Sequence, residues 1–128
     1  NGKIIPIDTY LEKVSAGSGN IAITGAKEEL LYPATKVSLK ADYCVVVSGD
    51  SMFPYCTDGD TLYIEKSQSI NHGEIGIFLL NGESYCKQYF SKDGIVKLVS
   101  LNEKYRPILI KNDNLIVQGR VLGKFYSD

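Results

Sequence analysis

A serine and a lysine are the side chains of this sequence best suited to covalent chemistry. Ser51 follows Gly49-Asp50 in a polar turn that ends an apolar run, and Lys87 lies in a strand-like stretch rich in aromatic residues. A serine hydroxyl becomes a strong nucleophile when a neighbouring base takes its proton, and a neutral lysine can be that base. The two residues therefore predict a serine–lysine dyad that cleaves peptide bonds without a histidine.

The surroundings of Lys87 favour the neutral amine that such a base requires. Lowering a lysine pKa from about 10.4 to about 7 or 8 costs roughly 3–4 kcal/mol, which burial in an apolar site can impose. On an alternating strand Lys87 shares its face with Tyr85 and Tyr89, so we expect its amine among aromatic rings. The alternative is a surface lysine whose stem lies on the rings while its charge reaches water.

The turn at Ser51 also has two interpretations. Met52, Phe53 and Pro54 place apolar bulk beside the hydroxyl, where it would exclude water. We expect the backbone N–H groups around Asp50 and Ser51 to face a developing oxyanion. The alternative is an ordinary turn, because Asp and Ser commonly hydrogen-bond their local backbone.

A short segment of small residues upstream is a candidate substrate. Val14-Ser15-Ala16-Gly17 suits a chain that must lie extended in a narrow cleft, with Val14 as an apolar anchor. The predicted scissile bond joins Ala16 to Gly17. The alternative is that this glycine- and serine-containing stretch is only a flexible loop.

Composition excludes several classes of protein. The 128 residues are enough for about one domain, and the net charge of −1 with a pI near 5.8 argues against a basic nucleic-acid-binding surface. No apolar run is long enough to span a bilayer, and the first residue, which is not Met, predicts a fragment or processed product. We expect no cofactor and no metal.

The cysteines and the histidine predict no chemistry of their own. Cys44, Cys56 and Cys86 are odd in number and lack C-x-x-C spacing, so we expect packing residues in a reducing, cytoplasmic setting rather than disulfides or a zinc site. His72 lies in a turn-like stretch and is expected at the surface.

The chain divides into two parts by its pattern. Residues 1–40 predict an N-terminal arm with short strands that carries the cleavage-site region, and residues 28–32 favour one helical turn. Residues 41–128 predict the serine–lysine catalytic and dimerisation core, a mostly β, compact and highly twisted fold with hairpin turns at Asn81-Gly82 and Asp93-Gly94. Strands are expected over residues 44–47, 61–65, 74–80, 83–90, 95–99, 108–110, 115–117 and 120–125.

Together these motifs resemble the C-terminal domain of the LexA-type self-cleaving repressors, a serine–lysine peptidase family (S24) that includes phage repressors and the UmuD mutagenesis proteins. The resemblance covers nearly the whole chain. It is carried by residues 14–17, 48–52, 58–62 and 82–87, and by Asn102, Tyr105, Pro107 and Ile108.

The resemblance implies a function and partners. Lys87 would take the proton of Ser51, which would attack the Ala16 carbonyl within the same chain. A RecA filament on single-stranded DNA would stimulate this cleavage in the DNA-damage (SOS) response. A homodimer would form through the C-terminal strands near residues 115–125. DNA would be bound only by an N-terminal helix-turn-helix domain absent from this chain, and the full repressor would be cytoplasmic and nucleoid-associated in a bacterium.

Three alternatives remain open at this stage. A UmuD-like mutagenesis protein would be processed by the same chemistry but would serve an error-prone polymerase. A signal peptidase would share the serine motif and a lysine, although the in-chain Ala16-Gly17 bond and the missing membrane anchor argue against it. A module that keeps the fold only to dimerise would not need both Ser51 and Lys87.

Overall fold

The computed structural model describes residues 2–11, 26–111 and 113–126. These residues form one mixed sheet of nine strands in the order β2-β1-β3-β4-β9-β5-β6-β7-β8. All neighbouring strands run antiparallel except β1 and β3, which are parallel. The strands are β1 (Ile4–Tyr10), β2 (Lys27–Pro33), β3 (Tyr43–Val46), β4 (Thr61–Lys66), β5 (Ile75–Leu80), β6 (Glu83–Lys92), β7 (Ile95–Val99), β8 (Ile108–Ile110) and β9 (Leu115–Lys124).

Helical structure in the described residues is limited to one 3₁₀ turn, η1 (Ser38–Lys40). Among these residues no helix has the length and apolar character needed to cross a membrane. The predicted fold class, a mostly β and highly twisted domain, is therefore confirmed.

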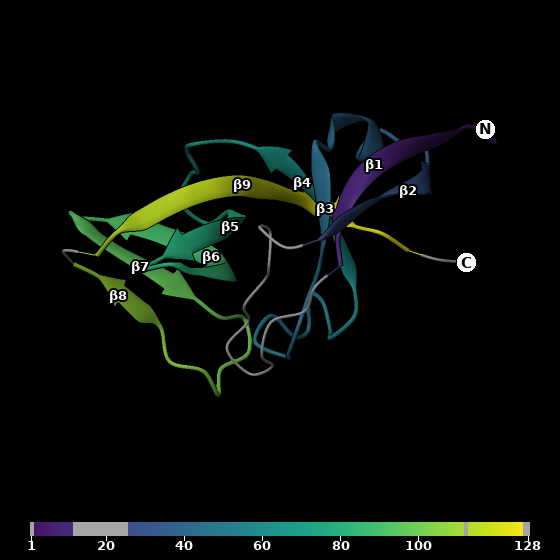
Figure 1. Ribbon diagram of the computed structural model, residues 1–128. Helices are drawn as coiled ribbons and strands as arrows, with labels where there is room; N and C mark the ends of the chain where they lie inside the picture. Colours follow the sequence, from purple (N-terminus) through teal and green to yellow (C-terminus); the bar gives the residue numbers. More distant parts are fainter. Residues whose placement is uncertain (1, 12–25, 112, 127–128) are drawn as a thin grey trace.

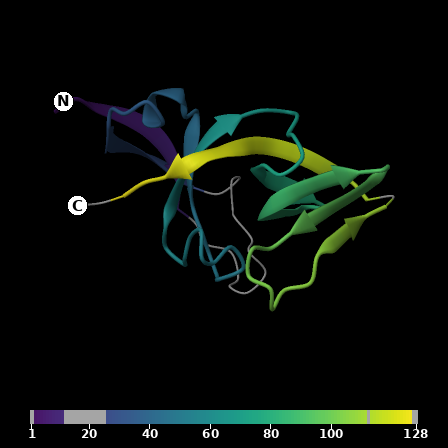
Figure 2. The same cartoon turned by 180° about the vertical axis from the view of Figure 1, so that it is seen from behind.

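Strand β9 arches across the molecule and joins its two ends, as Figure 1 and the reverse view in Figure 2 show. It pairs with β4 on one edge and with β5 on the other, and each ladder contains a register shift. Such bulges bend a strand and increase its twist. At one of them Gln118 leaves the ladder, and its carbonyl oxygen accepts a hydrogen bond from the Tyr43 hydroxyl at 3.0 Å.

Hairpin turns connect β5 to β6 and β6 to β7, as the sequence predicts. Asn81 and Gly82 both have positive φ, at 49° and 88°, and so do Asp93 and Gly94, at 52° and 78°. Positive φ at both central residues defines the turn whose twist matches that of the flanking strands. These two turns fix the register of β6, the strand that carries Lys87.

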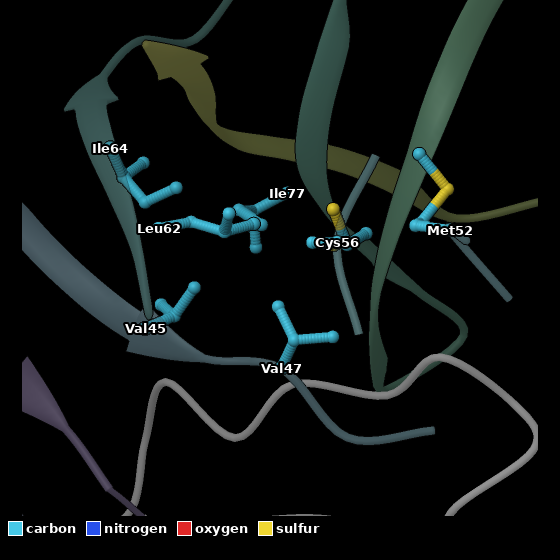
Figure 3. Packing of buried hydrophobic residues seen from close by; sticks show 8 residues of the cluster. Val45, Val47, Met52, Cys56, Leu62, Ile64 and Ile77 are labelled. Carbon is cyan, nitrogen blue, oxygen red and sulfur yellow. The ribbon is translucent and has the colours of Figure 1, made fainter. Parts of the chain in front are cut away.

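The core lies in three clusters of buried side chains along the sheet. Figure 3 shows the central one, in which side chains from β3, β4 and β5 meet those of the segment after β3. Its members Met52 and Cys86 are the chain neighbours of Ser51 and Lys87. Burying a large apolar side chain contributes about 1.5–3 kcal/mol, so this cluster anchors the two strand regions that carry the predicted dyad.

Two expectations about local structure are wrong. Residues 28–32 do not form a helical turn but belong to β2, because Leu30 and Tyr32 face the core while Leu31 between them faces solvent. The side-chain period is therefore two, as in a strand. The two strands expected over 115–117 and 120–125 are one, since Gln118 forms a bulge and Gly119 pairs again with Ile77.

The division into an arm (1–40) and a core (41–128) remains a prediction. Strands β1 and β2 form a hairpin, and β1 also pairs with β3 through Thr9 and Tyr10. The strands of the predicted arm thus belong to the same sheet as the strands of the core.

Replacement of Gly119 tests the crossing of β9 between β4 and β5. A Cβ at Gly119 would lie 2.9 Å from the Glu65 carbonyl oxygen and would also clash with Ile64. We expect Gly119→Ala to lower the free energy of unfolding by about 1–3 kcal/mol in urea titrations, because backbone cannot easily move aside. Gly123→Ala on the same strand is the control, since its Cβ would meet only a Val37 methyl at 3.3 Å. Equal losses in both variants would contradict this reading of the strand crossing.

Candidate active site

Ser51 lies at the start of the connection that follows β3, in a turn held from several sides. Gly49 has a φ of 85°, a value that glycine adopts without strain, and its N–H donates to the Asp58 carboxylate at 2.9 Å. The Asp50 carbonyl oxygen accepts a hydrogen bond from the Phe53 N–H at 3.2 Å. The Ser51 residue is only 2% exposed. The turn therefore buries the hydroxyl-bearing residue, which an ordinary surface turn would leave in water.

The apolar residues after Ser51 divide between core and surface. Met52 is buried in the central cluster, as the water-excluding role requires. Phe53 is 52% exposed, so its ring contributes less to exclusion of water than the sequence led us to expect.

Lys87 is buried in the middle of β6, opposite Gly76 of β5. The residue is 3% exposed, and its amine donates a hydrogen bond to the Ser100 hydroxyl at 2.7 Å. Burial lowers the pKa of Lys87 below its ordinary value, although the nearby Cys86 thiol acts in the opposite direction. The alternative of a lysine whose charge reaches water is therefore wrong.

Two aromatic rings flank the Lys87 amine, but only one of them was expected. The ring centroids of Tyr85 and Tyr105 each lie 5.8 Å from Nζ. The Tyr89 ring instead stacks on Phe78, with centroids 6.0 Å apart. Tyr105 reaches the amine from the connection between β7 and β8, which alternation along β6 could not reveal.

The three-residue segment 100–102 connects the surroundings of Ser51 with those of Lys87. Ser100 contacts the lysine amine, and the Asn102 N–H donates to the Ser51 carbonyl oxygen at 3.0 Å. The Asn102 side-chain amide donates to the Asp50 carbonyl oxygen, also at 3.0 Å. The structure thus brings Ser51 and Lys87 into one buried region, with hydrogen bonds from one short segment to both.

Asp50 is held by the same connection between β7 and β8. Its carboxylate accepts a hydrogen bond from the Tyr105 hydroxyl and pairs with the Lys104 ammonium at 2.9 Å. The Tyr105 hydroxyl, and next the Lys104 ammonium, hold the pKa of the Asp50 carboxyl below its usual range. Asp50 is therefore ionised near neutral pH, and its charge is directed toward Lys104 rather than toward Lys87.

Sequence analysis missed Ser100 and assigned no role to Asn102 or Tyr105 beyond matching the family motif. A signal for Ser100 was present: it continues the alternation of β7 on the face of the fully buried Leu98. A hydroxyl at a core-facing position must find a polar partner. The identity of that partner could not be read from the sequence.

The other sequence-predicted residues are placed as follows. The cleavage-site residues Val14, Ser15, Ala16 and Gly17 lie outside the described residues. His72 is exposed, as expected, and its Nδ1 accepts a hydrogen bond from the Ser91 N–H at 3.1 Å.

The three cysteines are free, buried packing residues, as expected. Burial raises the pKa of the Cys44 and Cys56 thiols to about 11 and also raises that of Cys86. Thiols with raised pKa values are poor nucleophiles at neutral pH. Within the part of the chain that the structure describes, no three His, Cys, Asp or Glu side chains are grouped closely enough to hold a metal ion.

Ser51 and Lys87 are both buried, and segment 100–102 hydrogen-bonds to both residues. A serine and a neutral lysine amine are together able to cleave a peptide bond without histidine. In agreement with that chemistry, the sequence model described as Peptidase S24-like matches residues 8–122, and the chain belongs to this family.

Comparison with individual proteins gives LexA repressors. The chain is 33% identical to the LexA repressor of Carboxydothermus hydrogenoformans over 116 residues, which are 88% of this chain and 56% of that protein. It is 28% identical to the LexA repressor of Acetivibrio thermocellus (98% of this chain, 59% of that protein) and 29% identical to that of Clostridium novyi (94% and 59%). The resemblance to LexA-type proteins is therefore confirmed, and the chain spans a little over half the length of these relatives.

Replacing the buried amine of Lys87 tests its environment. The unfolded chain keeps the ordinary lysine pKa, so between the folded and unfolded values it binds more protons, and stability of the parent protein rises with pH. We expect Lys87→Met to raise the free energy of unfolding at pH 7 by on the order of 1 kcal/mol, with a smaller gain at about pH 10. Urea titrations at both pH values measure this, and the exposed Lys97→Met is the control. A gain that stays constant with pH would contradict a lowered pKa.

Tyr105→Phe tests the carboxylate of Asp50. Loss of the phenol donor should move the pKa of Asp50 back up toward its usual range, which carbon-13 NMR titration of the carboxyl measures directly. A carboxyl with a lowered folded pKa adds stability above its unfolded pKa and loses it on acidification. The variant should therefore lose less stability than the parent between pH 7 and about pH 3. Tyr126→Phe, which removes a largely exposed phenol, should leave the titration of Asp50 unchanged.

Proposed function

We propose that this chain is the self-cleaving and dimerising domain of a LexA-type transcriptional repressor, with Ser51 as nucleophile and Lys87 as general base. The observation that carries the proposal is the burial of the Lys87 amine. It lies beside the Ser100 hydroxyl and the rings of Tyr85 and Tyr105. Among the described residues no carboxylate pairs with this amine, so no ion pair there holds it in the charged form. A neutral amine at this place has a free lone pair and can accept the proton of a nucleophile as a general base.

The proposed reaction is cleavage of the Ala16–Gly17 bond within the same chain. The Lys87 amine takes the proton of the Ser51 hydroxyl, and the serine oxygen attacks the Ala16 carbonyl carbon. The tetrahedral intermediate collapses as the protonated Lys87 gives its proton to the departing Gly17 amine. This leaves an ester between Ser51 and Ala16.

The second half of the reaction releases the enzyme. Lys87, again neutral, takes a proton from water as the water attacks the ester, and the collapse returns that proton to Ser51. The products are a new carboxylate at Ala16 and a new amine at Gly17. Each step needs only the lysine as acid and base. This agrees with the sequence, whose one histidine, His72, is exposed at the surface.

The backbone N–H of Ser51 is the proposed donor to the oxyanion of the intermediate. The backbone N–H of Asp50, in the same turn, is the second proposed donor. The Asp50 side chain holds this turn in place through Tyr105 and Lys104. A single preorganised donor of this kind is worth about 10²–10³ in rate.

Regulation and partners follow from the family. We propose that a RecA filament on single-stranded DNA stimulates cleavage in the SOS response, that two copies associate near residues 115–125, and that DNA is bound by a part of the repressor outside this chain. The net charge of −1 supports the last point, since a domain that neutralises DNA phosphates is usually basic. The side chain of Ile116, on β9, is 46% exposed and thus available to an apolar contact. The full-length repressor is proposed to be cytoplasmic and nucleoid-associated.

Two other functions use the same residues differently. A UmuD-like mutagenesis protein would cleave the same bond without a DNA-binding domain, and a pure dimerisation module would not cleave at all. The burial of Lys87 favours a self-cleaving protein over a pure dimerisation module. A buried amine lowers stability, and a module that only dimerises would gain nothing from it.

Mass spectrometry of the chain incubated from pH 7 to 10 tests the proposal. Below the pKa of Lys87 the neutral fraction, and with it the rate, should rise about tenfold per pH unit. The products should be residues 1–16 and 17–128, and the rate constant should not depend on protein concentration. Ser51→Ala and Lys87→Ala should yield neither product.

Three outcomes would reject the proposal. They are cleavage that persists in Ser51→Ala, cleavage that is second order in protein, and no cleavage at any pH even with RecA filaments present. The last outcome would leave the dimerisation module as the function.

A further inference from the structure

Ser100 stands at the core-facing position just after β7, and it is held there rigidly. The residue is 6% exposed and follows the fully buried Leu98 on the same face. Two residues later the Asn102 N–H is bonded to the Ser51 carbonyl oxygen, and Leu101 between them packs against the central cluster. The Ser100 hydroxyl is therefore fixed relative to the backbone of the proposed nucleophile.

The partner of this hydroxyl is the amine of the proposed base. Lys87 Nζ lies 2.7 Å from Ser100 Oγ, within ordinary hydrogen-bond distance, and both residues are buried. A lysine side chain ends in a freely rotating amine on a flexible stem, so burial alone does not set the direction of its lone pair. A fixed acceptor for one N–H restricts that rotation.

We propose that Ser100 is a positioning residue for self-cleavage: its hydroxyl accepts an N–H of the neutral Lys87 amine and so directs the lone pair of that amine toward Ser51. This inference rests on the proposed function. The acceptor is a neutral hydroxyl rather than a carboxylate, so it orients the amine without the ion pair that would keep the amine protonated. Ser100 belongs to the segment whose Asn102 N–H bonds the Ser51 carbonyl oxygen. One short stretch of chain therefore positions both the base and the nucleophile.

The simpler role for Ser100 is to satisfy a buried donor and nothing more. That role predicts effects on stability and on the pKa of Lys87, but none on the rate once Lys87 is neutral. The positioning role predicts an effect on the rate at pH values where Lys87 is already neutral, since misdirection of the lone pair persists after deprotonation. The two roles therefore separate in the pH profile of the reaction.

The test compares Ser100→Thr with Ser100→Val, which have the same shape and differ in the hydroxyl. Cleavage of the complete chain is followed by mass spectrometry from pH 7 to 10. We expect Ser100→Thr to retain most of the parental rate and Ser100→Val to lose about 10- to 100-fold at the high-pH plateau. Ser84→Ala, on the same strand as Lys87 but bonded to Gln118, is the matched control and should cleave at the parental rate.

A second readout does not require cleavage. In a Ser51→Ala background, the Lys87 titration is followed by NMR with and without the added Ser100→Val change. A hydrogen bond from an ammonium is stronger than one from an amine, so loss of the acceptor should lower the pKa of Lys87 further. Urea titrations establish that each variant is folded.

The outcomes distinguish this inference from the function on which it rests. If Ser51→Ala and Lys87→Ala are inactive while Ser100→Val matches Ser100→Thr in plateau rate, the peptidase stands and the role of Ser100 is overturned. An unmoved pKa of Lys87 in the Ser100→Val variant overturns that role as well. If the parent chain does not cleave, the proposed function fails and the positioning role falls with it.

Discussion

The two hydrogen bonds from Asn102 to the carbonyl oxygens of Asp50 and Ser51 are the contacts on which the candidate site depends. The turn that carries Ser51 follows β3, whereas Lys87 lies on β6, and these strands are not neighbours in the sheet. Strand pairing therefore cannot set the position of one residue relative to the other. The connection after β7 does so, because it bonds the turn through Asn102 and the amine through Ser100. Both connections lie on the same side of the arch formed by β9 (Figures 1 and 2).

The negative charge of this turn is kept away from the Lys87 amine, which favours a neutral amine. The one carboxylate of the turn, Asp50, is directed toward Lys104 and Tyr105, and its negative charge is thus stabilised outside the buried region. Tyr105 also places its ring near the Lys87 amine, so a single side chain contacts both the Asp50 carboxylate and this amine. A carboxylate in contact with Lys87 would instead have raised the lysine pKa and prevented it from acting as a base. Burial lowers the pKa of Lys87, and among the residues described no carboxylate pairs with its amine to raise it.

Much of this architecture follows from local patterns, and the rest does not. The hairpin at Asn81-Gly82 and the alternation along β6 were predictable because turn residues and a period of two act over a few positions. Three features were not: the stacking of Tyr89 on Phe78, the approach of Tyr105 to Lys87, and the bulge that keeps β9 continuous. Each depends on residues distant in sequence. Ser51 and Lys87 could be selected because the family motif records their relation. The alternation of β7 places Ser100 on the core face, whereas its partner is visible only in the structure.

The place of β9 has a consequence for the order in which the protein is made. This strand follows the other eight in sequence, yet it is the one that separates and joins β4 and β5. A chain emerging from the ribosome holds Ser51 beside β3 and β4 and Lys87 on the β5–β6 hairpin, and no strand ladder connects these two pieces until residues 115–124 have been synthesised. Until then the hydrogen bonds of segment 100–102 are the contacts that join the two pieces. The sheet that carries both groups is therefore completed by the last strand to be synthesised.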